Sequence, residues 1–197
     1  MGNFTTVPDV VSGQSFPPSL WESAIMNNLN LGVYRQLADT TLSSDTASIT
    51  FASIPQTFAH LILAVYARDS GAGTTAPDGL QAQFNGDTAA NYDWYEATLV
   101  GGGSFGQTSM RIGWVVPGGA SANLFSATYI LIPHYTQAVN HKAAVAIATA
   151  KISNSIIYST HLGGLWRSAN ALTQILLQSS SGNLKSGSRA TLYGLPA

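Results

Sequence analysis

The sequence contains no cysteine, which excludes a disulfide framework, a zinc–thiolate site and a cysteine nucleophile. Charge is scarce as well, because Asp, Glu, Lys and Arg make up only 9% of the 197 residues, against roughly 25% in ordinary soluble domains. The eight Lys and Arg form no run or stripe, so the basic footprint of a nucleic-acid-binding protein is missing. We therefore expect no nucleic-acid partner.

Long hydrophobic segments are also missing. No apolar run approaches the roughly 18 residues that a membrane-spanning helix needs. Residues 1–10 lack the basic and apolar regions of a secretory signal. We expect a protein that is made in the cytoplasm and does not insert into a membrane.

What the chain does contain is apolar residues, at 45%, and 19 Gly. Its length suits a single domain with a short appendage. A surface so low in charge fits two descriptions: an ordinary β-sandwich covered with Ser, Thr and Asn, or a subunit whose faces are covered in an assembly. We favour the second, because a low-charge surface protects poorly against association.

The N-terminal region, residues 1–45, has its own pattern. Residues 1–18 contain three Pro and no periodicity, which predicts an extended arm. Ser19 and Glu22 then form a capping box, and an apolar stripe of Trp21, Ile25 and Leu29 predicts a helix over residues 19–30. A helix this short is marginal alone. The stripe is therefore a candidate assembly contact, on its own domain, a neighbouring subunit or a particle scaffold.

From residue 46 to 197 the pattern changes to short β-branched and aromatic runs, which predicts an antiparallel β-sandwich domain. Two nearly continuous apolar runs, residues 60–66 and 128–132, predict strands covered on both faces, by the arm, the helix or another subunit. The glycine-rich stretches 71–79 and 101–106 are expected to be loops. Strands are predicted near residues 47–52, 59–68, 79–84, 92–99, 108–116, 123–133, 142–152, 156–167, 171–179 and 189–194.

No metal or cofactor site is predicted. The four His lack paired-ligand spacing. The segment from Asn85 to Glu96 has the length of an EF-hand loop, but Ala89 and Ala90 stand where a ligand and a Gly are needed. Turn chemistry is the preferred reading of this segment, and a calcium site of another kind is the alternative.

The chain is not expected to be an enzyme, and no catalytic residue is predicted. A glycan hydrolase would need two nearby carboxylates, which Asp93 with Glu96 or Asp69 with Asp78 would supply; we rank this reading last. Tyr92 and Trp94 share one face of a predicted strand. They are candidate glycan or receptor contacts, with core packing as the commoner role for such aromatics.

Several stretches resemble the jelly-roll modules of minor structural proteins of tailed bacteriophages. Residues 186–195 resemble the closing strand of these modules, and Phe84-Asn85-Gly86-Asp87 followed by Asn91-Tyr92 resembles an earlier turn. Asn85-Gly86 also predicts a type I′ turn. The match spans roughly residues 47–195, and residues 20–30 are similar to a helical module that often precedes such domains. It further includes Ile54-Pro55, Phe58, His60-Leu61, Gly164 and Trp166.

This resemblance implies a jelly-roll-like β-sandwich and a non-enzymatic virion structural protein, on the exterior of the capsid as a decoration or in the tail. It implies contacts with other virion proteins and a homo-oligomer, most often a trimer. The family shares no catalytic residues, so none is carried over. The alternative is a receptor- or glycan-binding tail fibre or tip module that contacts a host surface glycan.

Overall fold

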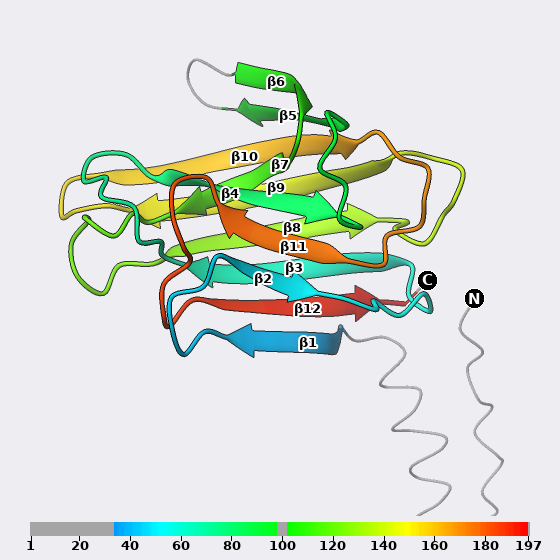
Figure 1. Ribbon diagram of the computed structural model, residues 1–197, viewed down its shortest axis with the longest axis horizontal. Helices are drawn as coiled ribbons and strands as arrows, with labels where there is room; N and C mark the ends of the chain where they lie inside the picture. The colour runs from blue at the N-terminus through cyan, green and yellow to red at the C-terminus, as the bar shows by residue number, and fades with distance from the viewer. Residues whose placement is uncertain (1–33, 98–101, 197) are drawn as a thin grey trace, which may run out of the picture.

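The computed structural model describes residues 34–97 and 102–196, and Figure 1 draws these as coloured ribbon. The extended arm and the predicted helix with Trp21, Ile25 and Leu29 lie outside the described residues. The described chain is all-β, with two antiparallel sheets packed face to face, so the predicted β-sandwich is confirmed. No helix of the described ranges is long and apolar enough to cross a membrane.

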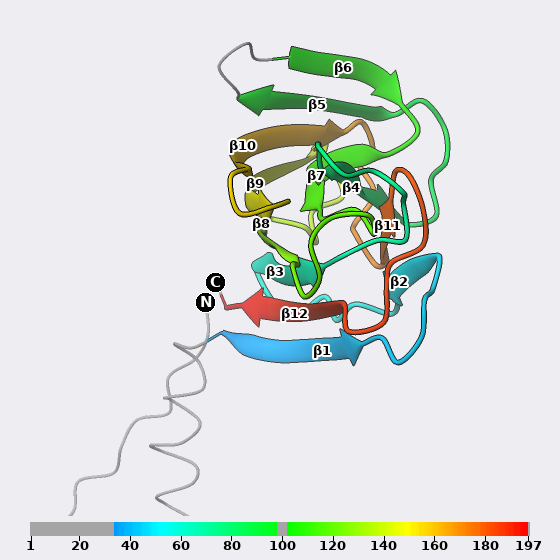
Figure 2. The same ribbon diagram turned by 90° about the vertical axis from the view of Figure 1, so that its left-hand side faces the viewer.

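The two sheets differ in size. Figure 2 shows them side by side, with the larger sheet running from β1 to β6 and the smaller one against part of it. The larger sheet has, in spatial order, β1 (Arg35–Thr41), β12 (Arg189–Leu195), β3 (His60–Ala67), β8 (Ser126–Pro133), β9 (Lys142–Lys151), β10 (Ile157–Trp166), β5 (Tyr92–Ala97) and β6 (Gly102–Gln107). The smaller sheet has β2 (Ser48–Phe51), β11 (Ile175–Ser179), β4 (Asp78–Phe84) and β7 (Met110–Val115).

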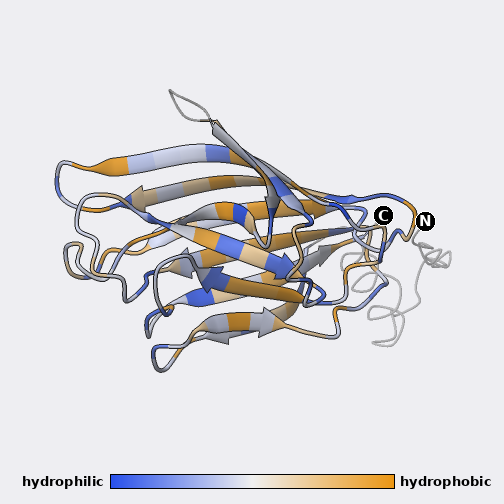
Figure 3. Cartoon of the chain, turned by 45° about the horizontal axis from the view of Figure 1, so that its top comes forward, coloured by the Kyte–Doolittle hydropathy of each residue, from blue (hydrophilic) through white to orange (hydrophobic). Residues whose placement is uncertain are grey.

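Alternation of buried and exposed residues is clearest in β8 and β9 of the larger sheet. In β9 every second residue is buried, and these include Ala144, Ala146 and Ala148, while the residues between them are exposed. Polar and apolar residues are interleaved in the same way along other strands (Figure 3). Because side chains alternate between the two faces of a strand, one face of the sheet supplies the core and the other remains outside. The largest side chains of that core are Trp166, Tyr92, Tyr135 and Phe84.

Two strands were missed by the sequence patterns. Residues 101–106 were expected to be a loop, but Gly102–Gln107 is β6, which pairs with β5. The expectation was wrong because glycine lowers intrinsic strand preference, while pairing with a neighbour decides the outcome. Arg35–Thr41, within the region expected to hold the arm and helix, is β1 and pairs with β12. The first strand of the described chain is therefore Arg35–Thr41.

The second cover predicted for the two apolar runs is not supplied by the described residues. The smaller sheet covers the inner face of β3 and β8. On their outer face Tyr66 is 48% exposed, Tyr129 46% and Leu131 37%. The outer face of the eight-stranded sheet is therefore open in the described part of the chain.

Two loops at the ends of strands are fixed by local hydrogen bonds, the turn at Asn85-Gly86 and the loop contacted by Arg68. Asn85 and Gly86 both have positive φ, at 52° and 68°, and the Asp87 N–H bonds the Phe84 carbonyl at 2.9 Å, which confirms the predicted type I′ turn. At the other end of the sandwich the buried guanidinium of Arg68 donates hydrogen bonds to four backbone carbonyls, those of Gly118, Ala120, Ser121 and Leu124.

Candidate functional site

Tyr92 is a core residue, so its candidate role as a ligand contact is wrong. Its side chain is fully buried, and its ring stacks on Trp166 with the centroids 6.5 Å apart. The hydroxyl accepts a hydrogen bond from the Phe84 N–H and donates one to the Asp87 carbonyl, both at 2.9 Å. Burial raises the pKa of Tyr92 to about 12. Nothing outside the protein can reach this ring.

Trp94 shares the inward side of β5 with Tyr92, as the strand periodicity predicts, and this inward placement also rules it out as an open sugar platform. It is half-buried, and the guanidinium of Arg111 lies 4.7 Å from its ring centroid. The same guanidinium lies 4.8 Å from the ring of Trp114 and 3.5 Å from Oε2 of Glu96. Trp94 therefore packs in a cation–π stack at the edge of the core.

The segment from Asn85 to Glu96 uses its oxygens for turns. Oδ2 of Asp87 accepts hydrogen bonds from Trp166 Nε1 at 2.7 Å and from Asn91 Nδ2 at 2.9 Å, and Oδ1 accepts the Ala89 N–H. Burial alone would raise the pKa of Asp87, but these three hydrogen bonds outweigh it and hold the pKa below its ordinary value. Oδ1 of Asn85 accepts backbone N–H groups from the 173–174 segment. The oxygens do not converge on a common point for calcium.

Of the two candidate carboxylate pairs, Asp93 and Glu96 lie on opposite sides of β5, whereas Asp69 and Asp78 lie close together. Asp93 lies on the outward side of β5 beside Arg167, at 3.7 Å, and Glu96 lies on the inward side. Asp69 and Asp78 do come together. Burial, reinforced by the charge of Asp69 and a hydrogen bond with it, raises the pKa of Asp78. A Cβ at Gly71 would lie 3.0 Å from Oδ2 of Asp78 and 3.1 Å from Oδ1 of Asp69, so the two carboxyls flank the same glycine.

The histidines form no metal site in the described ranges, where no three His, Cys, Asp or Glu side chains gather. His60 and His134 are the one close pair we find there, with their ring centroids 4.7 Å apart. His60 Nδ1 accepts the backbone N–H of His134 at 3.1 Å, so this ring shapes the turn after β8.

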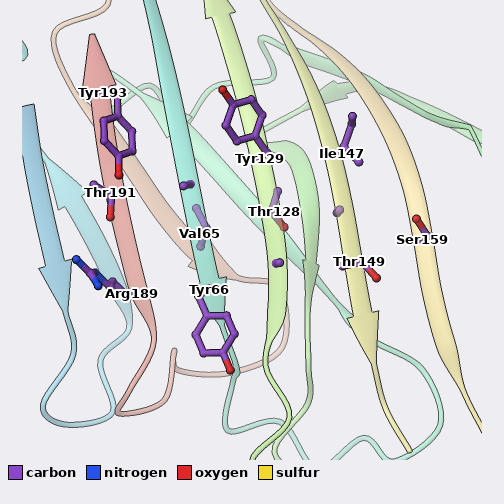
Figure 4. Close-up of a pocket in the computed structure, with 13 residues that line it drawn as sticks. Val65, Tyr66, Thr128, Tyr129, Ile147, Thr149, Ser159, Arg189, Thr191 and Tyr193 are labelled. Atoms are coloured by element: carbon purple, nitrogen blue, oxygen red, sulfur yellow. The ribbon is translucent and has the colours of Figure 1, made fainter. Parts of the chain in front are cut away.

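The feature that the sequence patterns missed is a groove on the outer face of the eight-stranded sheet. It has a volume of about 770 Å³ and crosses β12, β3, β8, β9 and β10. Figure 4 shows Tyr66, Tyr129 and Tyr193 on three of these strands, with hydroxyl side chains around them. Its volume lies within the roughly 300–1,000 Å³ of ordinary ligand sites.

Strand register explains the shape of the groove. One row across the sheet runs Thr191, Ala64, Tyr129 and Ile147, and the next runs Arg189, Tyr66, Ala127, Thr149 and Ser159. An alanine therefore lies directly beside a tyrosine in each row, Ala64 beside Tyr129 and Ala127 beside Tyr66.

The groove has one charged pair at its rim. Arg189 donates two parallel hydrogen bonds to the carboxylate of Asp39, at 2.9 and 3.0 Å, and the Thr191 hydroxyl donates a third at 2.6 Å. Hydrogen bonds from Arg189 and Thr191 hold the pKa of Asp39 below its ordinary value. Burial, together with a hydrogen bond to Tyr34, raises the pKa of Tyr129. Both groups keep their usual protonation state at neutral pH.

Sequence reasoning could not assemble this groove, because its residues come from five strands between positions 64 and 193. The one sequence signal for the groove was the set of outward-facing residues in each alternating strand. No protein-family model matches this chain, and no curated protein sequence matches it significantly. Its function is therefore argued from its own residues.

Proposed function

We propose that the chain is a non-enzymatic structural protein on the exterior of a tailed-phage particle, as a capsid decoration or a tail component. In this proposal the arm and helix expected over residues 1–30 attach the chain to other virion proteins, and the β-sandwich is presented outward as part of a homo-oligomer, a trimer. We also propose that the β-sandwich is a jelly roll of the kind found in such virion proteins.

The observation that carries the assembly role is the open edge at β6. Among the described strands β6 pairs only with β5, and its sequence Gly-Gly-Ser-Phe-Gly-Gln has no charge and no proline. Phe105 on β6 is 75% exposed and Tyr95 on β5 is 54% exposed. Monomeric proteins protect sheet edges with charges, prolines or covering loops. An uncharged edge with exposed aromatics is suited to pairing with another subunit.

The opposite edge of the same sheet is a useful contrast. β1 carries Arg35 and Asp39, and Asp39 is held in the bidentate pair with Arg189. Charges of this kind discourage the addition of a further strand. The sheet therefore has one protected edge and one edge open to association.

The non-enzymatic part is supported by what the polar side chains do. Asp87, Asn85 and Arg68 are each hydrogen-bonded within turns or loops, and Glu96 is paired with Arg111. The phage part rests on the resemblance of the turn and strand motifs. Their residues Phe84, Asp87, Tyr92 and Trp166 meet in one aromatic and hydrogen-bonded cluster, which is consistent with a fold-defining motif.

Light scattering on the purified protein tests the assembly role. The expected species is three times the 20.6 kDa of one chain. Phe105→Lys should lower the association, because a charge at an edge opposes pairing. Val139→Lys is the matched control, since Val139 is 77% exposed but lies in a loop away from the β6 edge. A stable 20.6 kDa species at micromolar concentration would refute self-association.

Attachment to the particle is tested separately. A chain lacking residues 1–18 should co-sediment less with phage particles and should keep a cooperative melting transition, because all twelve described strands lie after residue 34. Unfolding of the truncated chain would show that the arm belongs to the domain core and would contradict its role as an anchor.

A receptor- or glycan-binding module is the second candidate. Tyr92 and Trp94 do not support it, because they face the core. The groove lined by Tyr66, Tyr129 and Tyr193 does support a binding function, and it is the observation that favours this second candidate.

A further inference from the structure

The tyrosines of the groove are presented for contact with a ligand. Tyr66 stacks on Phe125 at a centroid distance of 4.7 Å and an interplanar angle of 11°, yet it is 48% exposed. Phe125 therefore fixes the orientation of the ring from one side and leaves much of it open. A ring that is fixed before binding loses little conformational entropy when a ligand stacks on it.

The floor beside these rings is shallow and apolar. Ala64 lies between Thr191 and Tyr129 in one row, and Ala127 lies between Tyr66 and Thr149 in the next. Each alanine leaves room next to a tyrosine face. A flat ligand with an apolar face, such as the C–H face of a pyranose, fits such a position.

Hydroxyl groups surround the apolar floor. Thr149 and Ser159 line the side toward β10, and the Thr149 hydroxyl donates to the Tyr158 carbonyl at 3.0 Å, so its oxygen is left to accept a hydrogen bond. The Asp39–Arg189 pair stands at the opposite side and offers both an acceptor and a donor. Alternating donors and acceptors are what the hydroxyls of a sugar require.

Charge distinguishes the classes of ligand. Arg189 is the one charged residue lining the groove in the described chain, and Asp39 already neutralises it with two hydrogen bonds. A phosphate or another anion would therefore meet a guanidinium whose charge Asp39 already balances. The groove therefore favours a neutral ligand over nucleic acid or an acidic glycan.

We infer that this groove binds a neutral oligosaccharide chain. Five strands at about 4.8 Å spacing give it a width of about 19 Å across the sheet, which suits several sugar units rather than one. The inference deepens the proposed function, since exterior placement would present the groove to host surface glycans. Binding itself requires only the folded β-sandwich.

Electrophoresis of the full-length protein in native gels cast with dextran, mannan, galactan or rhamnan tests this inference. At least one neutral polysaccharide should retard the protein. Tyr129→Ala and Tyr66→Ala should each weaken that retardation at least tenfold in apparent dissociation constant. Val145→Ala is the control, because Val145 is 56% exposed on the same sheet face but lies outside the groove. Each of the three variants should keep the melting temperature of the wild type, so that a change in retardation does not come from unfolding.

Four results would overturn the inference. The first is no retardation by any of the four polysaccharides. The second is retardation that Tyr129→Ala and Tyr66→Ala leave unchanged. The third is retardation only in a gel cast with dextran sulfate, an anionic comparison, that vanishes with salt. The fourth is loss of self-association without any sugar effect in these variants, which would make the groove an interface between copies. Particle attachment is measured independently, so the proposed function and this inference can fail separately.

Discussion

The indole N–H of Trp166 donates a 2.7 Å hydrogen bond to Oδ2 of Asp87, across 79 residues of sequence. Trp166 ends β10 of the larger sheet, and Asp87 closes the turn after β4 of the smaller sheet. This bond therefore ties the two layers of the sandwich together at one end, beside the buried rings of Tyr92 and Phe84.

Asp87→Ala should lower the free energy of unfolding by about 2–3 kcal/mol, because hydrogen bonds to a charged acceptor are lost. The pKa of Asp87 is depressed in the folded state, so its contribution is present above 3.8 and is lost as pH falls through the folded value. Urea unfolding of both proteins at pH 7 and pH 3 measures this. A difference between them that does not shrink in acid would contradict the role of the carboxylate.

Asp78→Asn should raise the melting temperature at pH 7. Burial and the neighbouring Asp69 raise the pKa of Asp78 in the folded state, so its contribution is complete below 3.8 and is lost as pH rises through the folded value. An amide at position 78 avoids that loss. Melting curves from pH 4 to pH 7 should show the variant gaining on the wild type. Equal pH profiles would show that the two carboxyls do not interact.

Gly164→Ala should destabilise the protein by about 1–3 kcal/mol, the usual cost of overpacking. A Cβ at this position would lie 2.4 Å from Sδ of Met110, a side chain that is fully buried and has no room to move away. The neighbouring Gly163 is the control, because a Cβ there meets nothing within 4 Å. Chemical denaturation should separate the two alanine variants, with Gly163→Ala within about 0.5 kcal/mol of the wild type.

Arg68→Met should cost at least about 2 kcal/mol, because buried carbonyls would lose their donors. Residues 117–124 should then become more sensitive to proteolysis, since four of their carbonyls are held by this guanidinium. Arg35→Met, on the exposed end of β1, provides the comparison. An unchanged digestion pattern would show that the loop holds its shape without Arg68.

Period-two patterning predicted most of the sandwich because β8 and β9 alternate almost without exception. The Asn85-Gly86 turn was predicted for a similar reason, since its positive φ values restrict the residues that can occupy it. β6 was missed because Gly102, Gly103 and Gly106 carry no strand preference, and its pairing with β5 is a tertiary effect.

The candidate site was harder to predict, because alternation reveals which residues share a face and not which face is open. Tyr92 and Trp94 do lie on one side of β5, but it is the inward side, and Tyr95 points outward instead. The groove also depends on register between β3, β8 and β9, which sequence alone does not fix.

The position of β1 decides how mechanical load enters the domain. A pull applied at Arg35 loads β1, which has one neighbour among the described strands, β12. If the opposing force acts on the sheet face, β1 is loaded in shear against β12. The six residue pairs that join the two strands, and the Asp39–Arg189 ion pair, then share the load. If it acts on the C-terminal end of β12, beside the start of β1, the same pairs are peeled apart one by one. The mechanical strength of the connection is therefore set by where the second force is applied.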